Sequence, residues 1–110
     1  MSIFQKIIDG ELPCEKVFEN EKIFAFKDIA PIAPVHILII PKKPLASLQA
    51  AQQEDAQLLG EILLAAAAIA QKLQLKEGYR VLTNIGRDSG QLVPHLHFHL
   101  IGGRKLGSIG

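Results

Sequence analysis

The sequence predicts an α+β fold: an antiparallel sheet of about five strands with one long and one short helix. Three observations support this class. Short segments rich in β-branched and aromatic residues recur along the chain. Residues 47–75 carry an apolar stripe at helical spacing. The elements follow one another as helix, hairpin, strand, long helix and two strands. The 110 residues, of which 48% are hydrophobic, are enough for a single domain with its own core, which we expect over 1–110.

The chain is expected to begin with a short helix. Ser2 can accept hydrogen bonds from the first turn, and Gly10 and Pro13 end the helix. Its apolar residues fall on one face, and they are Ile3, Phe4, Ile7 and Ile8. The spacing therefore predicts a helix that lays one face on the core.

Three strands are expected next. Residues 17–18 and 23–26 flank a turn at Asn20 and are predicted to form a hairpin. Residues 28–34 contain two prolines, which prevents regular pairing and predicts a loop. Residues 36–40 are apolar on both faces of a strand, which predicts a central strand covered on both sides.

Residues 47–75 are expected to be helical, with an interruption near Ala51 and Gln52. The apolar stripe consists of Leu58, Leu59, Ile62, Leu63, Ala66, Ile69, Ala70 and Leu73. Residues 65–68 are all alanine, so the middle of the helix is apolar almost all round. One small core cannot cover such a helix, which favours a homodimer formed through it. The alternative is that alanine is there only as a strong helix former.

The C-terminal part is expected to hold two strands. Gly78 ends the helix, and residues 79–83 form the first strand. Residues 84–91 form a polar loop that contains glycine. Residues 95–100 then alternate histidine with bulky apolar side chains, and Gly102 and Gly103 end that strand.

The composition excludes several classes of protein. A formal net charge of +1, with acidic and basic residues interspersed, argues against a nucleic-acid-binding protein. The single cysteine, Cys14, allows no intramolecular disulfide and favours a reducing cytoplasm. Residues 1–10 are broken by charge, unlike a secretory signal. Residues 62–70, the most apolar stretch, are too short to span a membrane.

Three of the four histidines, His95, His97 and His99, stand at alternate positions. On a strand they share one face with neighbours roughly 6.6–7 Å apart. Binding of one metal ion by all three histidines is geometrically difficult. The row spans roughly 13 Å, and each His nitrogen must come within about 2.1 Å of the ion. Nucleophilic catalysis at phosphorus needs no such convergence. A merely polar strand is the third alternative.

The histidine row resembles the signature of the histidine-triad (HIT) family. The resemblance extends over the chain through the segments 3–8, 26–31, 33–36, 40–43 and 102–104. These segments are similar to the Hint branch, the nucleoside phosphoramidases. The resemblance implies a hydrolase that acts at the α-phosphorus of a purine nucleoside phosphoramidate or a related adenylate, without metal or other cofactor, and releases a nucleoside monophosphate.

The resemblance also implies roles for the histidines. His97 would be the nucleophile and form a nucleotidyl-histidine. His99 would contact the phosphate and help the leaving group depart, and His95 would orient His97 through backbone and side-chain hydrogen bonds. The fourth histidine, His36, would support the row by a hydrogen bond, although a histidine on an apolar strand is more often a satisfied core residue.

Nucleotide-binding residues follow from the same resemblance. Asp28 would accept hydrogen bonds from the ribose hydroxyls. An apolar slot for the base would be formed by Ile29, Phe26, Ile7, Phe4 and Leu38, and the phosphate side would be lined by Asn84, Gly90, Gln91 and the backbone of Leu92. Ordinary structural roles compete with these: a turn at Asp28, core packing at Phe26 and Leu38, and a loop cap at Asn84.

Two positions depart from the Hint pattern. Leu92 stands where the branch often has a serine, and it cannot donate a hydrogen bond to a leaving group. Pro94 stands where an aromatic residue is common, and because it has no N–H we expect it at a strand end or edge. The alternatives therefore include a dinucleoside polyphosphate hydrolase and a nucleotide-binding regulatory module with little turnover.

Overall fold

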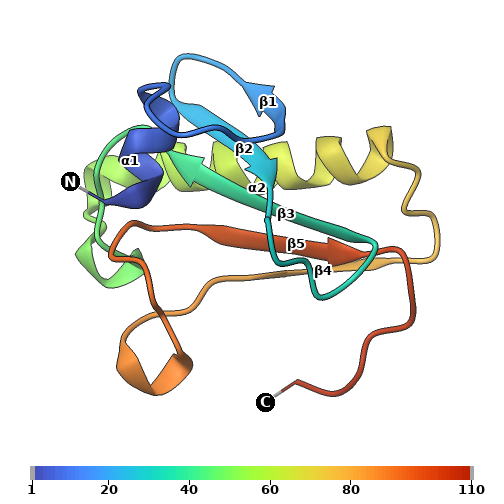
Figure 1. The fold of residues 1–110 in the computed structure, drawn as a ribbon. Coiled ribbons are helices and arrows are strands. Elements are labelled where there is room, and N and C mark those ends of the chain that lie inside the picture. Colours follow the sequence, from blue (N-terminus) through green and yellow to red (C-terminus); the bar gives the residue numbers. More distant parts are fainter. Residues whose placement is uncertain (1, 110) are drawn as a thin grey trace.

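A five-stranded antiparallel sheet carries the fold, with its strands in the order β1-β2-β3-β5-β4 (Figure 1). The structure is a computed structural model that describes residues 2–109. The strands are β1 (Lys16–Glu19), β2 (Ile23–Lys27), β3 (Val35–Pro41), β4 (Tyr79–Leu82) and β5 (Phe98–Gly102). The helices are α1 (Ile3–Ile8) and α2 (Ala56–Lys72), with short 3₁₀ turns at Leu48–Ala50, Gln53–Asp55 and Arg87–Ser89. The predicted α+β class is confirmed.

The central strand is β3, which pairs with β2 on one side and β5 on the other. Its residues from His36 to Pro41 are all buried, as the apolar character of both faces predicts. Alternate residues of a strand point to opposite faces, so the sheet has two separate cores. The face toward α2 contributes Ile23, Ala25, Ile37 and Ile39 to a core with the helix. The face toward α1 contributes Phe24, Phe26, Leu38 and Ile40 to a core with Phe4.

The α1 helix agrees with its prediction. Ser2 is its N-cap, and the Ser2 hydroxyl accepts a hydrogen bond from the Gln5 N–H at 3.2 Å. Gly10 follows the helix with a φ of +80°, a backbone conformation that glycine adopts without strain. The helix buries Phe4 and half-buries Ile7, so it delivers aromatic and aliphatic side chains to the face of the sheet that carries the histidines.

The long helix is shorter than residues 47–75. The predicted interruption is confirmed at Ala51, whose backbone is extended (φ −69°, ψ 147°), and the α-helix begins only at Ala56. The buried Asp55 stabilises this start, because its carboxylate pairs with Lys43 at 2.5 Å and accepts from the Gln52 N–H at 2.8 Å. Within residues 2–109 no helix is both long and apolar enough to cross a membrane.

The apolar stripe of α2 is narrower than predicted. Leu63 and Leu73 are 50% and 40% exposed. The buried face consists of Ile62, Ala65, Ala66, Ile69 and Ala70. The other predicted members of the stripe are buried or half-buried: Leu58, Leu59, Ile62, Ala66, Ile69 and Ala70. The small alanine side chains let the helix lie close to the sheet. Several apolar side chains of α2 therefore remain exposed.

The strand that was predicted to start at His95 starts at Phe98. Pro94 has no N–H for a ladder. His95 makes a tight bend by donating its N–H to the Val93 carbonyl at 2.8 Å. Pro94 therefore lies in a bend before the strand and not at its end, and the prediction that His95 and His97 belong to the strand is wrong.

Two backbone groups of this bend find partners outside the sheet ladder. The Leu96 N–H donates to the Leu45 carbonyl at 2.7 Å. The His97 carbonyl accepts from the Thr83 hydroxyl at 2.7 Å. The alternation of side chains nevertheless continues through the bend, since Leu96 and Phe98 are buried in the core with α2. The histidines consequently lie on the side of α1.

The turn after β5 packs tightly against the loop that precedes β3. Gly103 has a φ of +91°, and a Cβ placed there would lie 2.9 Å from Cβ of Pro34. Both the backbone conformation and the close approach to the proline ring require glycine. This contact joins the C-terminal end of the histidine-bearing strand to residues 28–34.

We predict that Gly103→Ala lowers the free energy of unfolding by about 2 kcal/mol, because the added Cβ meets both left-handed strain and the Pro34 ring. Urea denaturation would measure this loss. Gly107→Ala is the matched control, because no atom lies within 4 Å of a Cβ there and its φ is not in the left-handed region. Equal midpoints for the two variants would contradict the predicted constraint.

Candidate active site

Four histidines converge on the α1 side of the sheet. His36 comes from β3 and His99 from β5, and the register places His99 opposite Leu38. The rings of His97 and His99 are 5.2 Å apart between centroids, and those of His36 and His99 are also 5.2 Å apart. The fourth histidine of the chain therefore joins the predicted row.

Both ring nitrogens of His95 are occupied. Its Nε2 lies 2.9 Å from the Pro41 carbonyl, an acceptor, so Nε2 carries the proton. Its Nδ1 accepts from the Ser2 hydroxyl at 3.1 Å. A hollow of about 720 Å³ opens beside this ring, between the start of α1 and Pro94. The ring nevertheless has no free nitrogen, so His95 is not available as a nucleophile.

The ring of His97 is held with one nitrogen free. Its Nδ1 donates to the carbonyl of His95 at 2.7 Å, which leaves the lone pair of the neutral ring on Nε2. The Phe4 ring packs edge-on against it, with centroids 4.9 Å apart and planes at 82°. Burial lowers the pKa of His97, partly opposed by its hydrogen bond to the His95 carbonyl. His97 is thus a neutral imidazole at neutral pH, with its one proton on Nδ1. The predicted orienting role of His95 rests on its carbonyl, and its side chain takes no part.

His36 and His99 form a directed hydrogen-bonded pair. The Ile32 N–H donates to Nδ1 of His36 at 3.2 Å, so the proton of His36 is on Nε2. That Nε2 lies 2.9 Å from Nδ1 of His99, which must therefore be the acceptor. The proton of His99 is then on its own Nε2. Burial lowers the pKa of His99 to about 4, with further contributions from His97 and His36.

Asp28, His36 and His99 have side chains of the kind that bind metal ions. A carboxylate oxygen of Asp28 and nitrogens of His36 and His99 lie within 4.8 Å of one another. A metal on Nε2 of His36 would require the proton on Nδ1, where it would face the Ile32 N–H. The hydrogen bonding of this cluster therefore opposes metal binding and favours the histidine pair described above.

Asp28 lies at the edge of this cluster. Its Oδ1 accepts from the Ala30 N–H at 2.9 Å, so the predicted turn is present. Its Oδ2 lies 3.4 Å from Nε2 of His36. One carboxylate oxygen thus forms the turn, and the other points toward the histidines.

The apolar residues predicted for a base slot divide into two groups. Phe4, Phe26 and Leu38 are buried in one core, and Ile7 packs against it. Phe4 joins this core to the row, since its ring contacts both Phe26 and His97. Ile29 is different, because its side chain is 94% exposed.

The residues predicted for the phosphate side are placed mainly by loop interactions. The Gln91 side chain accepts from the Gly86 N–H at 2.9 Å and donates to the carbonyls of Ala46 and Val93. Gly90 ends a 3₁₀ turn in the left-handed conformation, with a φ of +89°. Asn84 is half-buried, and the Leu92 side chain is 91% exposed. Gln91 therefore holds its loop against residues 46 and 93, while Leu92 faces solvent.

Three groups that hold the histidines were not identified from the sequence. Ser2 was expected only as a helix cap, yet its hydroxyl also reaches His95. Thr83 was expected at the end of a strand, yet it binds the His97 carbonyl. The third group is the backbone N–H of Ile32. A hydroxyl residue beside a predicted strand end could have drawn attention to Thr83, but no sequence pattern reports the direction of a backbone N–H in a loop.

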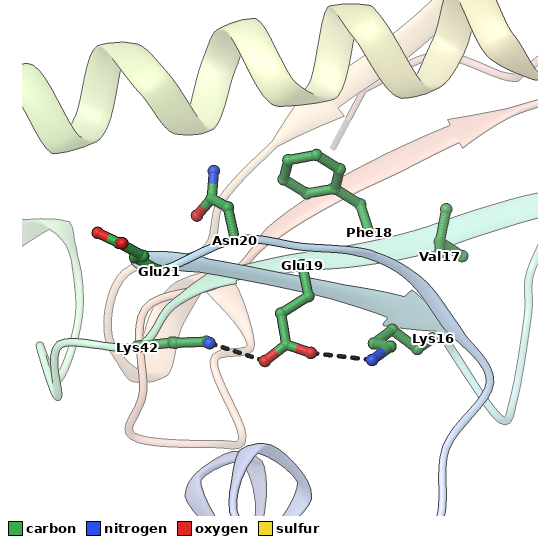
Figure 2. A pocket seen from close by; sticks show the side chains of 7 residues that line it. All are labelled: Lys16, Val17, Phe18, Glu19, Asn20, Glu21 and Lys42. Carbon is green, nitrogen blue, oxygen red and sulfur yellow. Dashed lines mark hydrogen bonds and ion pairs between the residues drawn. The ribbon is translucent and has the colours of Figure 1, made fainter.

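A second hollow, of about 540 Å³, lies at the β1–β2 hairpin (Figure 2). In it Glu19 lies between Lys16 and Lys42, with an ion pair to each at 2.9 and 2.7 Å. These two lysines lower the pKa of Glu19 by hydrogen bonding. None of the histidines lines this hollow. Lys16 and Glu19 lie on the edge strand β1, where charge opposes pairing with the strands of other chains.

Comparison with known proteins points to one family along nearly the whole chain. The family model of the HIT domain matches residues 9–106. An uncharacterized HIT-like protein of Synechococcus elongatus is 52% identical over 105 residues, which cover 96% of this chain and 92% of that protein. A HIT family hydrolase from Clostridium thermocellum superposes with a TM-score of 0.93 at 46% identity, covering 98% of this chain and 95% of that one. A histidine triad nucleotide-binding protein from Candida albicans gives 0.84 at 38% identity, covering 100% and 84%.

The lowered pKa values of His97 and His99 predict a loss of stability in weak acid. In the unfolded chain both imidazoles bind protons below about pH 6.5. In the folded chain His99 binds one only near a pKa of about 4, so the unfolded state gains protons first and the free energy of unfolding falls across that interval.

Urea denaturation between pH 7.5 and 4.5 would measure this loss. His99→Gln removes one of the titrating groups and is expected to make the decrease shallower. An unchanged pH dependence in His99→Gln would contradict the assignment of His99 as a ring kept neutral by burial.

Proposed function

The chain belongs to the HIT domain family, and from this premise we propose that it is a nucleotide hydrolase that works without metal. It cleaves at the α-phosphorus of a purine nucleoside phosphoramidate or a related adenylate. The reaction passes through a nucleotidyl-histidine on His97 and releases a nucleoside monophosphate. The Hint branch, as opposed to other HIT proteins, is part of this proposal.

One observation carries the proposal: the hydrogen bond from Nδ1 of His97 to the His95 carbonyl. It fixes the lone pair on Nε2, and burial keeps the ring unprotonated at neutral pH. An unprotonated imidazole nitrogen is a competent nucleophile toward phosphorus. Because the Phe4 ring packs against His97, the ring is also held in one orientation before substrate binds, which lowers the entropic cost of attack.

The reaction has two steps. In the first, the lone pair on Nε2 of His97 attacks phosphorus, and the bond from phosphorus to the leaving nitrogen or oxygen breaks. In the second, water attacks phosphorus and releases His97. The leaving nitrogen takes up a proton from solvent in the first step, and the attacking water releases a proton to solvent in the second. Nε2–H of His99 donates a hydrogen bond to the leaving atom or to a phosphate oxygen, whichever gains negative charge in the transition state.

The nucleoside is proposed to lie along the α1 side of the row. Oδ2 of Asp28, which lies 3.4 Å from Nε2 of His36, would accept from a ribose hydroxyl with its remaining lone pair, since Oδ1 is engaged in the turn at Ala30. The apolar group around Phe4 and Ile7 supports the base from one side. Ile29, being almost fully exposed, could cover the base from the other side when it binds. Such a slot reads shape, which suits a purine without selecting among purines.

The leaving group is the least constrained part of the substrate. The exposed Leu92 offers an apolar surface and no donor. A substrate panel decides between phosphoramidates, acyl adenylates and dinucleoside polyphosphates. Tight binding of a nucleoside monophosphate without turnover of any of these would instead indicate a regulatory module.

We further propose a homodimer formed through α2, in the cytoplasm. The helix exposes Leu63 and Leu64, which are 50% and 72% accessible, together with Ala67 and Ala68. No charged residue interrupts α2 between Glu61 and Gln71. Because this surface offers no charge for a partner of opposite sign, a second copy of the same uncharged face is the occupant that fits it best.

We predict that His97→Ala lowers kcat on adenosine phosphoramidate by at least about 10²-fold, because the covalent route is lost. The assay is run with and without a chelator, which should leave the activity of the unaltered protein unchanged. A rapid quench followed by mass spectrometry should detect a nucleotide adduct on the intact protein and none on His97→Ala. His99→Ala is the matched control, slower in turnover but still able to form the adduct. Full activity in His97→Ala would refute the proposed nucleophile.

We predict that Leu64→Asp converts a dimer to a monomer, because paired carboxylates would meet at the uncharged interface. Light scattering coupled to size-exclusion chromatography would measure the mass. Leu92→Asp serves as the control, since this leucine is even more exposed but lies outside α2. A monomeric unaltered protein would contradict the dimer proposal directly.

A further inference from the structure

The tautomer of His99 depends on groups that lie far from the reacting atoms. Nδ1 of His99 accepts from Nε2 of His36, and Nδ1 of His36 accepts from the Ile32 N–H. Each ring carries one proton, so the direction of the first bond sets the direction of the second. The Ile32 N–H, together with the Asp28 carboxylate whose Oδ2 lies 3.4 Å from Nε2 of His36, therefore favours the proton on Nε2 of His36 and hence on Nε2 of His99.

Ile32 lies in the loop of residues 28–34, which is tied to β3 at Asp28, whose N–H donates to the His36 carbonyl at 2.9 Å. The Ile32 N–H and the Ile32 carbonyl belong to successive peptide units that share the Ile32 Cα, so a bond to the carbonyl also restrains the N–H. The Ile32 carbonyl accepts from Nη2 of Arg104 at 2.8 Å. Nη1 of the same guanidinium donates to the Lys105 carbonyl at 2.9 Å, so both terminal nitrogens of Arg104 are hydrogen-bonded. A hydrogen bond from a charged donor is stronger than one between neutral groups.

The position of Arg104 is itself fixed by the fold. It directly follows Gly103, whose backbone lies against Pro34. The turn after β5 thus meets the loop at two places, by packing at Pro34 and by hydrogen bonding at Ile32. The strand that carries His99 and the residue that holds Ile32, Arg104, are consequently parts of one continuous segment.

We infer that Arg104 is a positioning residue, which holds Ile32 through its carbonyl and thereby restrains the adjoining Ile32 N–H, so that His36 and then His99 adopt the tautomer with the proton on Nε2. The inference rests on the proposed function for its effect on turnover. Without the guanidinium, the Ile32 N–H is no longer held toward His36, whose proton can move to Nδ1. Nε2 of His36 then offers a lone pair, the proton of His99 moves to Nδ1, and the donor that faces the substrate is lost.

The effect on catalysis should appear in kcat rather than KM. Arg104 lies outside the proposed nucleotide-binding residues, so substrate binding is retained, whereas the donor to the leaving group is misplaced. We expect Arg104→Met to lower kcat by about 10- to 100-fold, the range expected when a catalytic group loses its orientation. Arg104→Lys retains a cationic donor and should recover part of this loss.

The matched control is Arg80→Met. Arg80 also donates from its guanidinium to a backbone carbonyl, that of Gly107 at 2.8 Å, but it has no link to Ile32. It carries the same charge and makes the same kind of surface hydrogen bond. An equal loss of kcat in Arg80→Met and Arg104→Met would show a general effect of removing such a bond and would overturn the inference.

The decisive experiment is NMR of the imidazole nitrogens in ¹⁵N-labelled protein, free of substrate. The unaltered protein should show His36 and His99 with the proton on Nε2, and Arg104→Met should show both as mixtures of tautomers. Unchanged tautomers in folded Arg104→Met would overturn the inference; if that variant does not fold, the same comparison is made on Arg104→Lys, with a smaller shift expected. The spectra do not depend on turnover, so a lack of activity on every substrate would refute the proposed function while the tautomers still decide the role of Arg104.

Discussion

The bond between Nδ1 of His97 and the His95 carbonyl is the interaction on which the site depends. In a continuous sheet ladder that carbonyl would be engaged by a neighbouring strand. It is free because the chain bends at Pro94 and enters β5 only at Phe98. The same bend leaves the His97 carbonyl for the Thr83 hydroxyl. The departure from regular strand structure is therefore what turns a row of histidines into one ring with a lone pair directed outward.

The four rings also show how similar side chains acquire different properties from the backbone around them. Both ring nitrogens of His95 are hydrogen-bonded, one to a carbonyl and the other to a hydroxyl. His97 has a donor occupied and a lone pair free, whereas His99 has a lone pair occupied and a donor free. Burial keeps the latter two uncharged. A ring nitrogen with a free lone pair and a ring nitrogen with a free N–H thus stand side by side without competing for one proton.

The sequence was sufficient for the class of fold, because apolar periodicity and prolines determine which segments can be strands. The burial of β3 on both faces, the Ser2 cap and the interruption at Ala51 all follow from local chemistry. The start of β5 could not be predicted in this way. Side chains still alternate between the two faces in the bend before Phe98, although the backbone there makes no hydrogen bonds of the sheet. The groups that hold the site were also missed, since the Ile32 N–H and the Pro41 carbonyl are backbone atoms whose direction depends on tertiary packing.

The sheet order has a consequence for how the protein folds. β3 pairs with β5 across the whole of α2 and β4, and the bond between His36 and His99 spans 63 residues. Closing such a long loop costs entropy that neighbouring hairpins do not face, so this pairing is expected to come late. The site is then assembled by the same event that completes the sheet. A partly folded chain would hold its α1 face and its first hairpin yet lack the paired histidines, so the arrangement of the four rings is a property of the completed sheet alone.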